Sequence, residues 1–140
     1  MDKEATDFLK RLEREAEGTF WTFIGAELQA LDPERVRVTL SVQPHHLNTI
    51  GLLHGGVSAT LLDSAMGLVG MAARPDDTVV TTNLHLHYLA PVKRGTVTVT
   101  AEIVHSSRKL ITAQGHIYDE QGALCTFGTG TFRVLDRKAP

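Results

Sequence analysis

One carboxylate, Asp63, interrupts a long apolar run at residues 48–73, which reads NTIGLLHGGVSATLLDSAMGLVGMAA. Burying a charged group away from water is costly unless the group has partners or a chemical task. A carboxylate in such a place can act as a nucleophile, or as a general base that deprotonates water. The alternative is a structural acid that is hydrogen-bonded to a neighbouring backbone or hydroxyl group.

Gly55 and Gly56 lie where this run takes on helical spacing. The first N–H groups of a helix have no intrahelical acceptor, and the helix dipole adds partial positive charge there. Such donors can polarise a carbonyl group, and glycine lets a substrate approach the backbone closely. A tight start to the helix without chemistry is the simpler interpretation, and it is favoured when the dipeptide is taken alone.

Asp63 follows Gly55 by eight residues, so the two lie about 12 Å apart along a helix axis. A reacting carbon must lie within about 3 to 3.5 Å of its attacking atom while its oxygen meets the donors. One helix therefore cannot place both groups on one carbonyl. Either the two have unrelated roles, or Gly55 of one chain and Asp63 of another form a shared site in a symmetric homodimer.

The remaining elements must position this helix. Residues 2–17 predict an amphipathic helix, and the apolar pattern of residues 20–30 and 36–42, with a turn at Asp32 and Pro33, predicts a β-hairpin. Four more strand-like segments follow the long helix in meander-like succession. They are expected at residues 79–89, 96–105, 110–118 and 123–134.

Only one strongly apolar helix is available to cover this antiparallel sheet, so we predict an α+β fold in which the sheet wraps around the helix. Val57, Leu61, Ala65, Leu68 and Ala72 form one apolar stripe of the helix. A second stripe of small residues holds the acid and predicts contact with a second surface; it comprises Ala59, Asp63, Met66, Gly67 and Gly70.

The chain has the length of about one domain. We expect an N-terminal helix at residues 1–18, a single domain at 19–135 and a tail at 136–140. The net charge of −2 argues against a nucleic-acid partner. A mixed-charge N-terminus without a signal-peptide core, and a lone cysteine, favour a cytoplasmic protein. A membrane span is not expected, because the apolar run contains an acid, a histidine and five glycines.

A longer motif surrounds these residues and resembles that of the hotdog-fold acyl-CoA thioesterases. The similarity is strongest to the branch of the phenylacetyl-CoA thioesterases and thioesterase superfamily member 2. It covers about residues 20–134, since residues 85–124 also resemble the strand pattern of the family. The motif is N-x-x-G-x-x-H-G-G followed by an acid, and consists of Asn48, Gly51, His54, Gly55, Gly56 and Asp63.

The resemblance implies that the Gly55 N–H polarises the thioester carbonyl, and that Asp63 of the partner subunit is the nucleophile or the general base. It also implies that Asn48 lies near the thioester or the lytic water and that His54 shapes the helix start near the thioester. Thr81 matches a hydroxyl position, often serine in the family, that helps to hold the water. The products are a free acid and CoA, and no metal or other cofactor is needed because a thioester is already activated.

CoA carries phosphates, so cationic residues should line the entrance of its binding site. Arg108 and Lys109 are the first candidates, and Lys93 and Arg94 are the second. Solvated turn charges are the alternative. Substrate contacts are also expected at Gly56, Met66, Gly67 and Gly70. Aryl-acetyl, hydroxybenzoyl and medium-chain fatty acyl groups all remain open as substrates.

Other chemistries fit the sequence less well. His85 and His87 share one strand face but have no carboxylate or cysteine at a companion spacing, so we expect no metal site. Cys125 lies in an apolar strand and is expected to be a packing residue. A hotdog dehydratase or hydratase, and a non-catalytic acyl-CoA sensor, remain alternatives. The dimer could pair further into a dimer of dimers.

Overall fold

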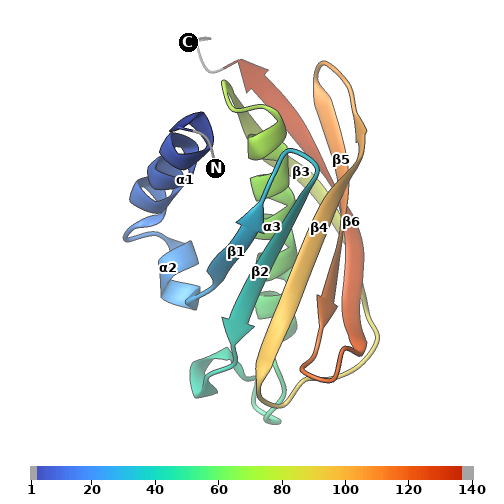
Figure 1. Ribbon diagram of the computed structural model, residues 1–140. Coiled ribbons are helices and arrows are strands. Elements are labelled where there is room, and N and C mark those ends of the chain that lie inside the picture. Colours follow the sequence, from blue (N-terminus) through green and yellow to red (C-terminus); the bar gives the residue numbers. More distant parts are fainter. Residues whose placement is uncertain (1–2, 137–140) are drawn as a thin grey trace.

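The computed structural model describes residues 3–136 and consists of a curled antiparallel sheet around one long helix, α3 (Gly55–Ala73) (Figure 1). The six strands are ordered β1-β2-β4-β5-β6-β3 across the sheet, and all neighbouring strands are antiparallel. This is the α+β arrangement predicted from the sequence. The strands are β1 (Glu27–Leu31), β2 (Arg35–Ser41), β3 (Asp77–Tyr88), β4 (Thr96–Ser106), β5 (Leu110–Tyr118) and β6 (Leu124–Asp136).

The helix α3 is the centre of the core. Its sheet-facing side is completely buried and consists of Leu61, Leu62, Ala65, Met66 and Val69. Along β4, buried residues of the concave face such as Val97 and Val99 alternate with threonines of the opposite face, as expected of a strand with one covered face. A Cβ atom at Gly115 would come within 2.8 Å of Leu62 Cδ2, so this glycine lets the helix pack closely on β5.

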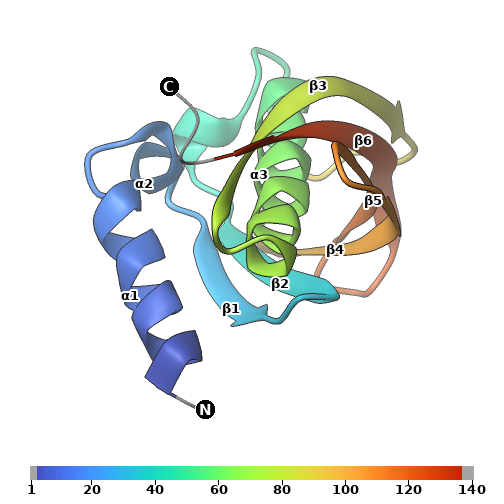
Figure 2. The ribbon, with the colours of Figure 1, turned by 90° about the horizontal axis from the view of Figure 1, so that it is seen from above.

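The length and composition of α3 would allow it to cross a membrane. Instead it is the helix around which the sheet curls in both views (Figures 1 and 2). Its other side, which includes Ala59, Asp63 and Gly67, is only half-buried within one chain. The structure therefore leaves the small-residue stripe partly open, whereas Met66 and Gly70, which we expected on that stripe, are buried.

Two expectations about the strands were wrong. The first half of the predicted hairpin strand is a short helix, α2 (Phe20–Ile24), which ends at Gly25 in the left-handed conformation. Aromatic residues favour strands only through packing, and here Ile24 is the one buried residue of the segment. The four later strands are not a simple meander either, because β3 pairs with β6 and leaves β2 beside β4.

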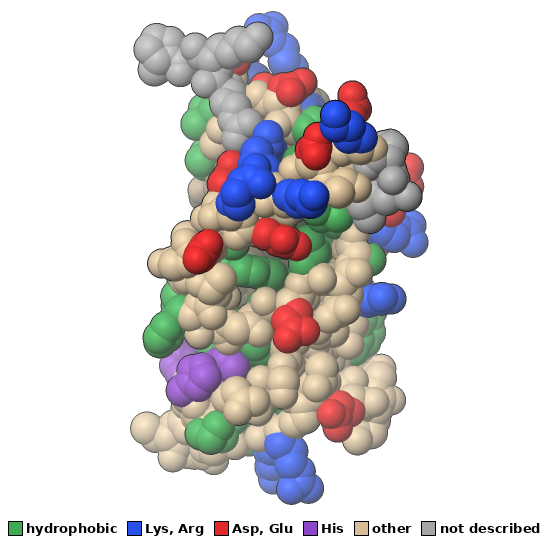
Figure 3. Space-filling model, turned by 60° about the vertical axis from the view of Figure 1, so that its left-hand side comes forward, with side chains coloured by type: hydrophobic (Ala, Val, Ile, Leu, Met, Phe, Trp, Pro, Cys, Tyr) green, Lys and Arg blue, Asp and Glu red, His purple; other side chains and the backbone are tan. Residues whose placement is uncertain are grey.

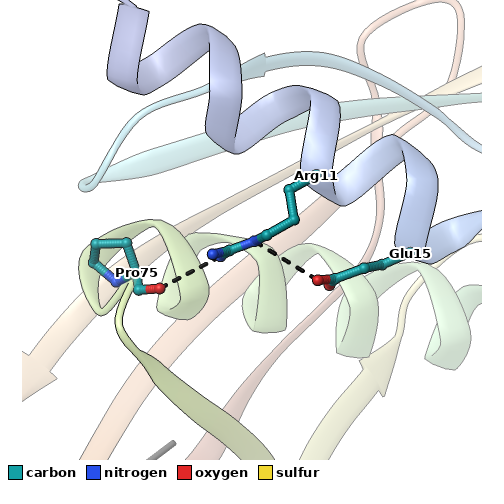
Figure 4. A network of polar contacts seen from close by, with 3 residues as sticks. All are labelled: Arg11, Glu15 and Pro75. Atoms are coloured by element: carbon teal, nitrogen blue, oxygen red, sulfur yellow. Dashed lines mark hydrogen bonds and ion pairs between the residues drawn. The ribbon is translucent and has the colours of Figure 1, made fainter.

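The helix α1 (Lys3–Ala16) lies outside the sheet, beside β1 and the open side of α3 (Figure 2). None of its described residues is buried. Its Arg11 reaches the end of α3, where Nη2 donates to the Pro75 carbonyl at 3.4 Å, while Nε lies 3.7 Å from the Glu15 carboxylate (Figure 4). Of the predicted tail at 136–140, only Asp136 is described, and it ends β6.

Candidate active site

The start of α3 leaves one backbone donor free. His54 is the N-cap residue, and its Nδ1 accepts the Gly56 N–H at 2.7 Å. The N–H groups of Val57 and Ser58 donate to the His54 carbonyl at 2.9 and 3.3 Å. Within residues 3–136 the Gly55 N–H has no acceptor. The helix start therefore offers the Gly55 N–H, together with the positive end of the dipole, to a ligand oxygen.

His54 and Gly56 form the cap of the helix and therefore have a different role from Gly55. The acceptor role of His54 Nδ1 requires the ring proton to be on Nε2 when the imidazole is neutral. A Cβ atom at Gly56 would lie only 2.9 Å from His54 Nδ1, so glycine is needed for this close contact. Gly56 thus allows the His54 ring to cap the helix, and its N–H is used in that cap. The Gly55 N–H is the donor that remains available.

Asn48 lies beside Gly55 in a cavity of about 280 Å³, here called the glycine cavity, which Tyr88 and Cys125 also line. The Asn48 Oδ1 accepts the N–H groups of Ile50 and Leu52 at 3.1 and 3.0 Å and so folds the loop before α3. This pattern assigns the oxygen to the loop and leaves the amide NH₂ as a donor at the cavity.

Asp63 lies in a second cavity, of about 340 Å³, here called the aspartate cavity. The Thr81 hydroxyl, on β3, donates to Asp63 Oδ1 at 2.7 Å. Thr81 comes directly before a β-bulge, which shifts the pairing of β3 with β6 between Thr81 and Asn83. Among the described residues no partner is found for Asp63 Oδ2. This oxygen is therefore open to water or substrate.

The two cavities share no lining residue. One contains Asn48 and Gly55, and the other contains Asp63, Thr81 and Gly67. A single chain thus carries both halves of the predicted site without bringing them together, as the axial rise along one helix requires.

The predicted substrate contacts are spread over the molecule. Met66 is completely buried and lines neither cavity, since the glycines at positions 115 and 130 of β5 and β6 give its side chain room in the core. Gly70 packs against Val79 of β3. Gly67, one helical turn after Asp63, lines the aspartate cavity.

The two cation pairs lie at opposite ends of α3. Arg108 and Lys109 are exposed in the turn between β4 and β5, where Arg74 at the C-terminal end of α3 donates to the Arg108 carbonyl at 3.3 Å. Lys93 and Arg94 directly follow Pro91 and Val92, which line the glycine cavity. Within one chain, the second pair is therefore next to Gly55 and the first pair is not.

Tyr88 is a site residue that sequence reasoning missed. Its hydroxyl donates to the Gly55 carbonyl at 2.7 Å, and its ring lies 3.4 Å from the position a Cβ atom at Gly55 would take. The alternation of Leu84, Leu86 and Tyr88 indicates the inward face of β3. The contact with Gly55 spans 33 residues, however, so no local pattern could have indicated it.

The competing chemistries would depend on His85, His87 and Cys125. His85 and His87 lie on the outer face of the sheet with ring centroids 5.3 Å apart, and His87 stacks on Phe127. Residues 3–136 contain no group of three His, Cys, Asp or Glu side chains that could hold a metal ion. Burial, and secondly the Asp119 carboxylate, raise the pKa of Cys125, so its sulfur remains a weakly nucleophilic thiol at neutral pH.

Known proteins share this architecture. The family model described as thioesterase superfamily matches residues 50–126. The mouse protein named acyl-coenzyme A thioesterase 13 is 32% identical over 79 residues, which are 56% of each chain. The crystal structure of thioesterase HI1161 from Haemophilus influenzae has a TM-score of 0.87 at 26% identity and covers 94% of this chain and 92% of that one. Zebrafish thioesterase superfamily member 2 gives a TM-score of 0.81 at 25% identity over 89% and 94% of the two chains.

Proposed function

Because this chain belongs to the thioesterase superfamily and is a hotdog-fold thioester hydrolase, we propose that it hydrolyses acyl-CoA esters to a free acid and CoA. The mouse relative carries acyl-coenzyme A in its name, which supports this class of thioester. The acyl group in this proposal is an aryl or medium-chain group, because the cavity beside Asp63 is lined by apolar side chains such as Leu68, Met71 and Phe132.

The free Gly55 N–H is the observation that carries the proposal. A thioester carbonyl oxygen bound there gains a hydrogen bond that strengthens as negative charge develops on the oxygen. The N-cap residue His54 accepts the Gly56 N–H on its Nδ1 at 2.7 Å, which fixes the helix start that presents the Gly55 N–H. The NH₂ group of Asn48 lies at the same cavity and supplies a second donor to the thioester or to the lytic water.

Asp63 of the partner subunit completes the site in this proposal. Its Oδ1 is held by Thr81, and its Oδ2 either attacks the carbonyl carbon or takes a proton from the attacking water. Either route requires the carboxylate to be close to a carbonyl that is bound at Gly55. The separation of the two cavities within one chain supports a two-fold dimer with two such sites.

In this proposal the CoA part of the bound substrate extends out of the site on the side of Gly55, and its phosphates lie there. Lys93 and Arg94, which directly follow the cavity residues Pro91 and Val92, are candidate cations of the same chain, and Arg108 and Lys109 of the partner subunit are further candidates. Asp119 and Glu120 share a small cavity with Lys93 and Arg94 and partly offset their charge.

Thiol release from a panel of acyl-CoA esters tests the proposed function. We expect steady hydrolysis of at least the aryl-acetyl or medium-chain members, which a thiol reagent follows directly. Binding of these esters without thiol release would instead favour the acyl-CoA sensor. Loss of thiol release upon exhaustive chelation would contradict the metal-free chemistry.

Replacing Tyr88 with phenylalanine should lower kcat by about fivefold. The change removes one hydrogen bond to the Gly55 carbonyl, worth about 1 kcal/mol, but keeps the ring that packs on Gly55. Because Tyr88 acts through Gly55 and touches no reacting atom, KM should change little. Tyr88→Ala, which also removes the ring, should be more damaging; a kcat for Tyr88→Phe equal to that of the wild type would contradict a role for the hydroxyl.

A further inference from the structure

The aspartate cavity extends from Asp63 along α3 toward its C-terminal end. Asp63, Gly67 and Met71 line it at four-residue spacing, which places them on one face of the helix. The sheet lines part of the cavity with Leu28, Val79, Thr81 and Phe132, but it does not supply the whole wall. A further part comes from the N-terminal segment, where Leu12 and Ala16 of α1 and Trp21 of α2 line the same cavity.

The helix α1 is attached to this cavity without being part of the core. Its apolar residues share one face, yet none of the described residues of α1 is buried. Figure 3 brings this side forward and shows charged side chains of both signs over the upper part of the molecule, with hydrophobic side chains between and below them. Of the Arg11 contacts in Figure 4, the hydrogen bond to the Pro75 carbonyl links α1 to the turn after α3, while the ion pair with Glu15 lies within α1. Residues 3–16 also lie outside the segment, 50–126, that the family model matches.

We propose that α1 and Trp21 form the end wall of the acyl pocket and set the length of the acyl chain that the enzyme accepts. The inference rests on the proposed function, because it requires the thioester carbon to lie at Asp63. The CoA side of the thioester leaves toward Gly55 of the other subunit. The acyl side must then enter the aspartate cavity and run past Gly67 toward Leu12 and Trp21.

Gly67 provides a way to shorten the pocket from within the helix. A Cβ atom at this position would meet only Phe132 Cε2 at 3.7 Å, an ordinary contact distance. Replacing glycine in a helix also removes a conformational penalty of up to about 1 kcal/mol. Gly67→Leu should therefore fold and fill the pocket one turn beyond Asp63.

A series of straight-chain acyl-CoA esters from acetyl to palmitoyl tests the end wall, with kcat/KM measured for each ester. Leu12→Ala should raise kcat/KM about tenfold for esters just longer than the wild-type optimum, and Gly67→Leu should lower it at least about tenfold for the optimal ester while acetyl-CoA is spared. Leu9→Ala is the matched control, since Leu9 lies on α1 but does not line the cavity.

Identical chain-length profiles for Leu12→Ala and Leu9→Ala, or equal losses on all esters in Gly67→Leu, would overturn the end wall. Calorimetric binding of the same esters to Asp63→Asn, with and without Leu12→Ala, separates this inference from the proposed function. If wild-type protein releases no thiol but the affinity optimum still moves to longer chains with Leu12→Ala, the hydrolysis fails and the end wall stands. An unmoved affinity optimum would overturn the end wall as well.

Discussion

Replacing Asp63 with asparagine should lower kcat for acyl-CoA hydrolysis by about a hundred- to ten-thousandfold. An amide oxygen is neither a base nor a nucleophile of comparable strength, whereas the size of the side chain hardly changes. Asparagine can still accept the Thr81 hydrogen bond through its Oδ1. The variant should therefore keep its fold, which thermal unfolding would show, while steady-state thiol release reports the loss.

Thr81→Ser is the matched control for Asp63. The serine keeps the hydroxyl that donates to Oδ1 at 2.7 Å, so its kcat should remain close to that of the wild type. Turnover by Asp63→Asn within tenfold of the wild type would show that the carboxylate has only a structural role.

Replacing Gly55 with proline should lower kcat by about a hundred- to a thousandfold, the effect of losing one oxyanion donor. Gly55 is the first residue of α3, where proline is tolerated because the N–H it lacks has no intrahelical partner. The preceding residue, His54, already has an extended ψ of 134°, as a residue before proline prefers. The substitution thus removes the N–H with little change to the helix.

Gly55→Ala separates the donor from the space around it. Alanine keeps the N–H and adds a Cβ atom at the same place, 3.4 Å from the Tyr88 ring. Its kcat should exceed that of Gly55→Pro by at least about tenfold. Equal kcat values for the two variants would mean that crowding against Tyr88, and not the missing donor, causes the loss.

The sequence was sufficient for the central helix and most of the sheet. The run from Gly55 to Ala73 is apolar on several sides, so only a helix enclosed by a sheet could bury it. The local pattern failed at Phe20 to Ile24, where aromatic residues favour a strand but Gly25 ends a short helix. It also could not specify that β3 pairs with β6, because the loop after Tyr88 allows β3 either edge of the sheet.

The candidate site was predictable to the extent that its parts lie close together in the chain. The spacing of Gly55 and Asp63 on one helix was enough to separate them into two half-sites. Met66 and Gly67 occupy different angular positions around the helix axis, so that Met66 faces the sheet and Gly67 lines the cavity. A periodic stripe is too coarse to resolve this difference. The Tyr88 contact with Gly55 depends on tertiary pairing and could only be seen in the structure.

Mixing two inactive variants tests the shared site most directly. Asp63→Asn and Gly55→Pro each lack one half-site, so each homodimer should have little activity. After complete subunit exchange, verified by native mass spectrometry, half of the dimers are mixed and each has one intact site of two. The mixture should then recover about a quarter of the wild-type thiol release, and a verified mixed dimer without recovered activity would contradict a site formed by Gly55 of one subunit and Asp63 of its partner.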